Sequence, residues 1–552
     1  MHRIAHGSNS IQVEEAPLVT VEEGNNNPVI ALDPAVVNTV AVVSSAAATP
    51  AVPPVPHFTY LFKDLVNNQD AHLPDVPTIL RDLKDLGLSM RDKEHKVAGD
   101  SNIPAAYTYF GQFVNHDISF MDAKKPENST DAGVLGDDMQ LAPWPENKIH
   151  TDIKNKRASI LDLDCLYGLI PSEKEEERTP PPPSESNPEM IKLGLVSKSG
   201  DRPPGKTDND DYDLLRGGMS KEPKFDRAAF IPDPRNDTHL IVSQLHVAFL
   251  RAHNNLVKDG NSFKQARRIL RDCYHWAIVH DFLMRIADPV IVKQVLESKD
   301  RLYKPPQQGP FSLPLEFTVA AFRFGHSMVR KGYYVSDTAR FVLLNRLYML
   351  IIMGKDLKPK PGLGYPSLPE NMIIQWEAFL PGTDVKNKAR QINTRIVEPL
   401  FNLLDETNVP VNGELSIAVQ DLKRGYMFRL PTGQAVAKEL GITNPITSKE
   451  IEDNACTVNE AQVKALTRSE TQLSSHTPLW FYILAEAAIR GKGNQLGPVG
   501  SRLVAEVFIG LIRRIPDSFL HTGWKPGHLG FNKDEFTITD LLRLAKVVRK
   551  NF

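Results

Sequence analysis

The sequence has little cysteine, no long apolar run and no excess of charge of either sign. Three cysteines in 552 residues are too few for a disulfide framework, and their odd number leaves at least one thiol unpaired within the chain. The 65 basic and 67 acidic side chains give a net charge of −2, so bulk electrostatics do not favour a nucleic-acid partner. No segment reaches the roughly 18 uninterrupted apolar residues of a membrane-spanning helix. The composition therefore favours a globular protein without a membrane span.

Other familiar signals are missing as well. Residues 1–19 have no apolar core behind their first charges, so we expect no Sec-type signal peptide. The chain shows no repeat with a period of 20–50 residues, no βαβ rhythm and no glycine-rich dinucleotide loop. The sequence leaves open whether the protein is cytoplasmic or exported by a leaderless route, and it does not indicate an oligomeric state.

Proline is over-represented, with 42 residues, or about 8% against about 5% in average proteins. The excess gathers in residues 29–56 and again in 171–224, where a proline tetrad stands among charge runs. We interpret residues 1–56 as a flexible, low-complexity arm and 171–224 as a flexible insertion. At roughly 150 residues per domain, length alone suggests three or four domains.

Apolar spacing elsewhere is mostly helical. Apolar residues at 241, 245, 248, 249, 252 and 256 predict one face of a helix, which Asp237 or Thr238 could cap. Residues 263–285, 317–329 and 500–512 are similarly apolar, and strand-like alternation is scarce. The sequence therefore predicts a mainly α protein.

Two segments place histidine in apolar surroundings. In YTYFGQFVNHDISF, 107–120, a helix would put Gln112 and His116 on one face beside Asn115. In FTVAAFRFGHSMVR, 317–330, Arg323 and His326 flank a glycine that would allow a flat ligand to approach closely. A core histidine with satisfied hydrogen bonds is the plain alternative for each.

Two further segments carry charge. Arg235 in DPRNDTHL, 233–240, stands just before the predicted helix and could reach a neighbouring site, although a surface arginine is the simpler reading. In ASILDLDCLYG, 158–168, Asp162 and Asp164 would lie on one side of an extended segment, with Asp117 as a further oxygen donor. Such oxygens suit a hard cation such as calcium, and a solvated acidic loop is the alternative.

Taken in order, GQFVNHD, DPRND, FRFGH and LGPVGSRLVAEVFIGL resemble the animal-type haem peroxidases of the peroxidase–cyclooxygenase superfamily, and bacterial members in particular. The resemblance runs from about Phe58 to Phe552, apart from 171–224. It implies one large, mainly α catalytic domain over 57–552 with few short strands. It also implies a haem-dependent peroxidase that uses H2O2 to oxidise a small organic, phenol-like reductant, with calcium as a second cofactor.

The resemblance also implies roles for individual residues. His116 matches the distal histidine, Gln112 its neighbour, and Arg235 the distal arginine. His326 matches the proximal iron ligand, and Arg323 and Arg424 match arginines on the propionate side. The calcium ligands would be the side chains of Asp117, Asp162 and Asp164 and the carbonyls of Ala158 and Ile160.

Four positions depart from the family pattern. Asn115 and Thr238 replace the Asp and Glu that form ester bonds to haem in mammalian members, so we predict non-covalent haem b. Asp421 stands where an Asn usually bonds the proximal histidine, which should lower the haem potential and favour phenols over chloride. Ala158 replaces a common Thr and should weaken calcium binding.

Two other functions remain open at this point. A fatty-acid oxygenase of the same superfamily is disfavoured, because Arg323 occupies the position, three before His326, where cyclooxygenases have a radical-forming Tyr. The third hypothesis is a haem-binding protein with little turnover. His116 and Arg235 argue against it, because a protein that only binds haem does not need an acid–base pair.

Overall fold

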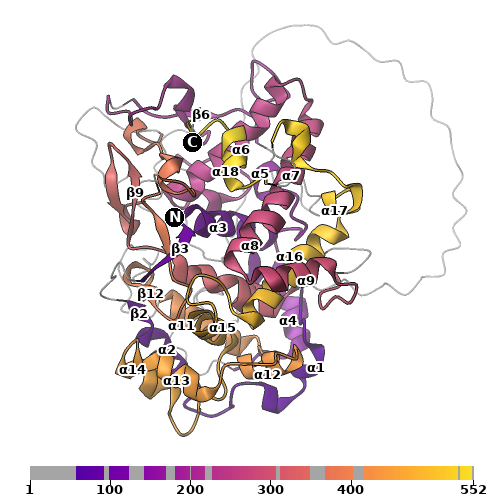
Figure 1. Cartoon of the computed structure of the whole chain (residues 1–552), viewed down its shortest axis with the longest axis vertical. Helices are drawn as coiled ribbons and strands as arrows, with labels where there is room; N and C mark the ends of the chain where they lie inside the picture. The colour runs from indigo at the N-terminus through magenta and orange to yellow at the C-terminus, as the bar shows by residue number, and fades with distance from the viewer. Residues whose placement is uncertain are drawn as a thin grey trace, which may run out of the picture.

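The computed structural model describes residues 57–92, 99–123, 142–168, 181–198, 200–217, 227–305, 311–347, 367–383, 385–401, 416–531 and 535–549. The arm expected over 1–56 lies outside these residues. In the described part, helices pack around each other and only short strands lie between them (Figure 1). This confirms the mainly α fold class and a single large domain in place of three or four.

Six longer helices supply most of the core: α3 (Ala106–Ile118), α6 (Leu240–Lys258), α7 (Phe263–Ala277), α11 (Ile417–Met427), α15 (Leu479–Ile489) and α16 (Pro498–Arg514). Nearly every residue of α6 is buried, and α15 is apolar on all sides. A helix with that pattern must lie inside the molecule. Figure 1 shows α3 near the middle of the structure, where it contacts α6.

Shorter α-helices complete the structure. They are α1 (Lys63–Val66), α2 (Ile79–Ser89), α4 (Glu146–Asp152), α5 (Asp164–Tyr167), α8 (Leu283–Ile286), α9 (Pro289–Glu297), α12 (Gly433–Glu439), α13 (Ser448–Cys456), α14 (Glu460–Leu466), α17 (Phe519–Thr522) and α18 (Ile538–Leu544). None of the helices within the described ranges is long and apolar enough to cross a membrane.

The strands of the described chain form six two-stranded sheets. Two are parallel and join distant segments: β1 (Phe58–Thr59) with β8 (Leu313–Pro314), and β2 (Arg91–Asp92) with β12 (Ile396–Val397). Four are antiparallel: β3 (Asp100–Pro104) with β11 (Lys388–Arg390), β4 (Met121–Ala123) with β5 (Ile153–Asn155), β6 (Gly194–Leu195) with β7 (Tyr212–Asp213), and β9 (Gly332–Ser336) with β10 (Arg340–Leu343). They connect segments around the helical core and form no continuous sheet.

The helix predicted over 317–329 is divided into two unusual pieces. A π-helical turn, Glu316–Ala320, is followed by the 3₁₀-helix η8, Ala321–Met328. The break falls at Ala320, whose φ of −124° and ψ of −69° are not helical. In a 3₁₀-helix, residues three apart eclipse each other, so Arg323 and His326 share one side. The irregular backbone thus brings both side chains to the same neighbour.

Part of the stretch 171–224 is packed against the core. Residues 181–198 and 200–217 are described, and within them Ile191 and Leu214 are buried. The backbone of Ile191 exchanges two hydrogen bonds, of 2.7 and 2.8 Å, with the side-chain amide of Asn254 in α6. This part is therefore not the flexible excursion that its composition suggests. Residues 171–180 and 218–224 lie outside the described residues.

The cap of α6 differs from the prediction. His239, and not Asp237 or Thr238, accepts a hydrogen bond from a backbone N–H of the first turn. Asp237 instead forms a bidentate pair with Arg216, and the Thr238 hydroxyl donates to the Arg235 carbonyl at 3.0 Å. The cap prediction was wrong because Arg216, which is far away in sequence, engages the carboxylate.

Candidate functional site

Helix α3 carries His116, which the sequence predicts to be the distal histidine. His116 is buried, and its Nδ1 lies 2.8 Å from Oδ1 of Asn236. Burial lowers the pKa of His116 to about 3, and the Arg235 cation contributes to this shift. One turn earlier, Oε1 of Gln112 lies 2.9 Å from Nε2 of His239. At neutral pH the site therefore has a neutral imidazole and a side-chain amide on one helix face.

Arg235 lies beside His116 in the 3₁₀ turn η5 (Pro234–Asp237). Its guanidinium donates to both Asp233 oxygens at 2.7 and 3.0 Å, to the Ser119 carbonyl at 2.8 Å and to the His116 carbonyl at 3.0 Å. It also lies over the Phe120 ring, 4.2 Å from the centroid. Four of its five N–H groups are thus engaged, which fixes the group and leaves one Nη1–H for a further acceptor.

The charge of Arg235 is shared through Asp233. Arg157 also contacts this carboxylate, with Nη2 at 2.6 Å. Burial would raise the pKa of Asp233, but the two guanidiniums lower it well below its ordinary range. Asp164 lies 3.6 Å from another nitrogen of the Arg157 guanidinium, so two carboxylates balance the two arginines. Arg235 is the cation that contacts the backbone of His116.

The proximal side is built by η8 and α11. Nδ1 of His326 lies 2.6 Å from Oδ2 of Asp421, so the carboxylate accepts the ring proton. The other Asp421 oxygen lies 3.5 Å from Nη1 of Arg323 and 3.4 Å from Nη1 of Arg424. Burial opposes ionisation of Asp421, but His326 and both arginines lower its pKa below the ordinary value. The histidine therefore faces a full negative charge.

The two proximal arginines bring an excess of positive charge. Burial and the neighbouring Arg323 lower the pKa of Arg424 to about 10. Burial also lowers the pKa of Arg323, and the Arg235 cation on the distal side contributes. Because η8 packs against α3, the clusters around His116 and His326 lie on contacting elements.

Two observations show that the residues around His326 fit a haem. A Cβ built on Gly325, next to His326, would meet no atom within 4 Å, so there is open space beside the ring. The excess charge of Arg323 and Arg424 suits the carboxylates of haem propionates. With Nδ1 held by Asp421, His326 would bind iron through Nε2.

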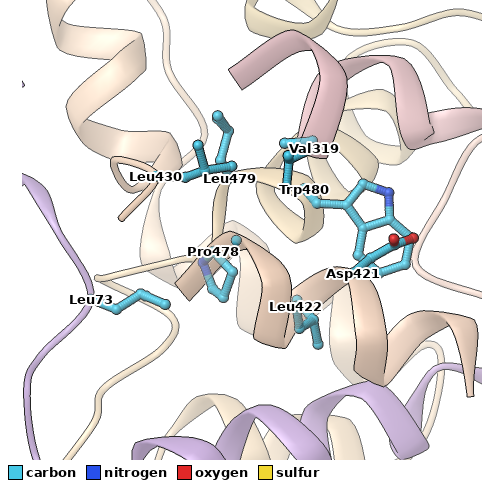
Figure 2. Close-up of a pocket in the computed structure, with 10 residues that line it drawn as sticks. Leu73, Val319, Asp421, Leu422, Leu430, Pro478, Leu479 and Trp480 are labelled. Atoms are coloured by element: carbon cyan, nitrogen blue, oxygen red, sulfur yellow. The ribbon is translucent and has the colours of Figure 1, made fainter. Parts of the chain in front are cut away.

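Figure 2 shows a hollow beside Asp421, between the π-helical turn η7 (Glu316–Ala320), α11 and the start of α15. Asp421 and Trp480 lie at its edge, and Leu73, Leu422 and Pro478 close it. Trp480 also donates from Nε1 to the Arg323 carbonyl at 3.2 Å, which steadies η8.

The residues predicted to bind calcium do not fit the ion as they are placed. Asp162 pairs with Arg267 and Arg271, and Asp164 lies 3.6 Å from Arg157. Asp117 accepts two backbone N–H groups, each at 3.2 Å, from the loop around it. Within the described ranges, no group of three or more His, Cys, Asp or Glu is placed to hold a metal ion.

In the loop that carries Ala158 and Ile160, every second residue has a positive backbone φ angle. Ser159, Leu161 and Leu163 all have positive φ, between 52° and 60°. A non-glycine residue in this region costs roughly 1–2 kcal/mol, so surrounding contacts must hold it there. The bonds from the N–H groups of Leu163 and Cys165 to Asp117 provide such contacts. Burial, with the nearby carboxylates of Asp164 and Asp162 adding to it, raises the pKa of Asp117 to about 7.

Several residues of the site were not identified from the sequence. Asp233 and Asn236 stand on either side of Arg235 in DPRND, but nothing in that pattern showed their partners. His239 and His246 lie in or next to α6, where they look like ordinary core residues. The structure also describes the two residues at the positions where mammalian relatives form ester bonds to haem. Asn115 is partly buried on α3, and the Thr238 hydroxyl donates to the Arg235 carbonyl.

The chain matches the model of the animal haem peroxidase family over residues 142–552, and it belongs to that family. Among solved structures, peroxidase A from Dictyostelium discoideum is similar at 15% identity and a TM-score of 0.52, covering 85% of this chain and 89% of that one. Fatty acid alpha-dioxygenases from Oryza sativa and Arabidopsis thaliana show 14% and 13% identity, with TM-scores of 0.46 and 0.45. They cover 84% and 87% of this chain and 76% and 78% of their own.

No curated protein matches the chain. The family match begins at residue 142, after α3, so His116 and Gln112 lie outside it. The contact of His116 with Arg235 and that of Gln112 with His239 therefore come from the structure, independently of the family model.

Proposed function

We propose that this protein is a haem-dependent peroxidase that uses H2O2 to oxidise small phenol-like donors. Family membership supports an oxidoreductase of this superfamily. The observation that carries the proposal is that the Arg235 guanidinium donates to the backbone carbonyl of buried His116 on α3, and that α3 packs against η8, which carries His326 of the His326–Asp421 pair. A neutral base and a fixed cation on one side, and a histidine that could bind iron on the other, are groups that support peroxide cleavage at haem.

Haem, bound through Nε2 of His326, would supply the electrons that cleave the O–O bond. Arg323 and Arg424 would bind its propionates. Because an amide at Asn115 and a hydroxyl at Thr238 cannot form the carboxylate esters of mammalian relatives, we propose non-covalent haem b. Acid–acetone extraction should remove all the haem, and haem that stays with the protein would contradict this.

On the distal side, His116 takes the proton from the peroxide and returns it to the leaving oxygen, as a general base and then a general acid. Arg235 offers its remaining N–H and its positive charge to the oxygen that becomes negative. Asp233 and two backbone carbonyls prevent the guanidinium from moving as charge develops. Gln112, held by His239, lines the same helix face and orients the peroxide.

The Asp421 carboxylate would make His326 a stronger donor to iron and would so stabilise the oxidised metal. A lower potential favours electron donors that are easily oxidised. We therefore propose phenols or similar molecules as the physiological class of reductant, with slow chloride oxidation.

The direct test is steady-state oxidation of a phenolic dye by the haem-loaded protein with H2O2, for the wild type and His116→Ala. The variant should be slower by about 100-fold or more, because the acid–base group is lost. Equal rates would show that the oxidation is adventitious haem chemistry. Chloride oxidation at neutral pH that matches the rate with the dye would refute the assignment of the donor.

A further inference from the structure

Asn236 connects two buried histidines on the distal side. Its Oδ1 lies 2.8 Å from Nδ1 of His116, and its Nδ2 lies 3.1 Å from Nδ1 of His246. The residue is fully buried, and the same turn that holds Arg235 holds it, since its backbone N–H donates to the Asp233 carbonyl at 3.0 Å. The amide therefore has little freedom to move away from either ring.

The polarity of the amide determines where each ring carries its proton. A side-chain carbonyl oxygen only accepts, and a side-chain NH2 only donates. His116 must therefore carry its proton on Nδ1, where it donates to Asn236. His246 must accept on Nδ1 and carry its own proton on Nε2.

The second histidine, His246, accepts from the NH2 group of Asn236 at 3.1 Å, and this bond fixes which way the amide faces. Nε2 of His246 is buried and has no hydrogen-bond partner in the described part of the chain. An unsatisfied buried N–H costs roughly 1–3 kcal/mol. The cost has a reason if the Nδ1 lone pair of His246 is needed to hold the NH2 side of Asn236, and with it the orientation of the amide.

We propose that Asn236 is a positioning residue that keeps the His116 proton on Nδ1, so that Nε2 stays a proton acceptor. The inference rests on the proposed function, because only a site that must accept a proton needs this tautomer. If the amide were reversed, Nε2 of His116 would carry a proton and could not take one from the substrate. His246 acts through Asn236 and touches no substrate.

The test uses cyanide as a probe of the base in the haem-loaded protein. Cyanide arrives as HCN and binds iron as an anion, so its association needs a group that takes the proton. Three variants are compared with the wild type. Asn236→Leu has a similar shape and no acceptor, Asn236→Asp keeps the acceptor, and Asn254→Leu removes a buried amide from α6 that bonds only to Ile191 in the contacts described above.

We expect Asn236→Leu to lower the cyanide association rate about 100-fold with haem affinity unchanged. Asn236→Asp and Asn254→Leu should stay within about threefold of the wild type. Wild-type rates in Asn236→Leu, or equal loss in Asn236→Asp, would overturn the inference. If Asn236→Leu does not fold, Asn236→Ala, which also lacks the acceptor, replaces it with the same expectation.

The same samples separate this inference from the proposed function. If the wild type binds cyanide fast, and only Asn236→Leu is slow, the positioning role holds even where H2O2 fails to react, and the peroxidase proposal fails. If the wild type reacts rapidly with H2O2 and Asn236→Leu reacts equally fast, the peroxidase proposal holds and the positioning role fails.

Discussion

At the scale of single residues, Asp421 determines the electronic character of the proximal histidine. Its carboxylate accepts the His326 proton at 2.6 Å, while Arg323 and Arg424 draw on its other oxygen. The arginines keep the carboxylate ionised inside the protein, where it would otherwise tend to be protonated. If His326 binds iron as proposed, its strength as a ligand would be set by a residue that does not touch the metal.

Asp421→Asn tests this role, because the amide keeps the shape and a hydrogen bond but removes the charge. The haem potential should rise by several tens of millivolts, as His326 becomes a weaker donor. Spectroelectrochemical titration of the haem-loaded protein measures it. Glu316→Gln, a buried carboxylate that binds backbone N–H groups of Leu61 and Phe62, serves as the control and should leave the potential unchanged. An unchanged or lower potential in Asp421→Asn would contradict the argument.

At the scale of helices and loops, the contact of α15 with the start of α16 depends on Glu486. Its Oε2 accepts the backbone N–H of Val499 at 2.9 Å, and its Oε1 has no hydrogen-bond partner within the described residues. Burial raises the pKa of Glu486 from 4.5 to about 8. The folded state thus binds this proton more tightly than the unfolded chain does, so the group's contribution to stability falls as pH rises from about 4.5 to about 8.

Glu486→Gln removes this titration while keeping an oxygen that can accept from Val499. Relative to the wild type, the variant should gain at least about 1 kcal/mol in free energy of unfolding between pH 5 and pH 9. Urea unfolding at the two pH values measures the difference. Glu439→Gln, an exposed change on α12, should give no such gain, and a pH-independent effect of Glu486→Gln would refute the prediction.

The loop before α5 allows a test of the second cofactor. With Asp162 bound to Arg267 and Arg271 and Asp117 bound to the loop backbone, the structure predicts no calcium site there. The melting temperature should therefore agree within about 1 °C in calcium and in EGTA. A rise of several degrees in calcium would show that Asp162 leaves its arginines for the ion, as the sequence prediction requires.

Helices could be predicted from the sequence where the apolar periodicity is strong. The prediction failed where contacts with residues distant in sequence determine the local backbone. The helix predicted over 241–256 corresponds to α6, because its apolar face is long and regular. The helix predicted over 317–329 is divided at Ala320, since the break serves the contact of Arg323 and His326 with α11 and leaves no local signal. The α6 cap likewise depended on Arg216, which engages Asp237.

At the scale of the whole molecule, the fold joins segments that no local pattern connects. The motifs predicted that His116 and Arg235 belong to one site, and the structure brings them together. They did not predict Asn236 or His246, because those contacts depend on the packing of α3 against α6. The flexibility predicted from composition was wrong for 181–198 and 200–217. A few buried side chains, such as Ile191, hold these residues against the core although most of their neighbours are polar.

The most direct test of the central claim is a haem titration followed by a single addition of H2O2, recorded by absorption spectroscopy for the wild type and His116→Ala. We predict that both bind one haem per chain with the same Soret band. The wild type should then change spectrum rapidly on adding peroxide, and His116→Ala at least about 100-fold more slowly. Failure of the wild type to bind haem, or equal rates in the two proteins, would contradict the account.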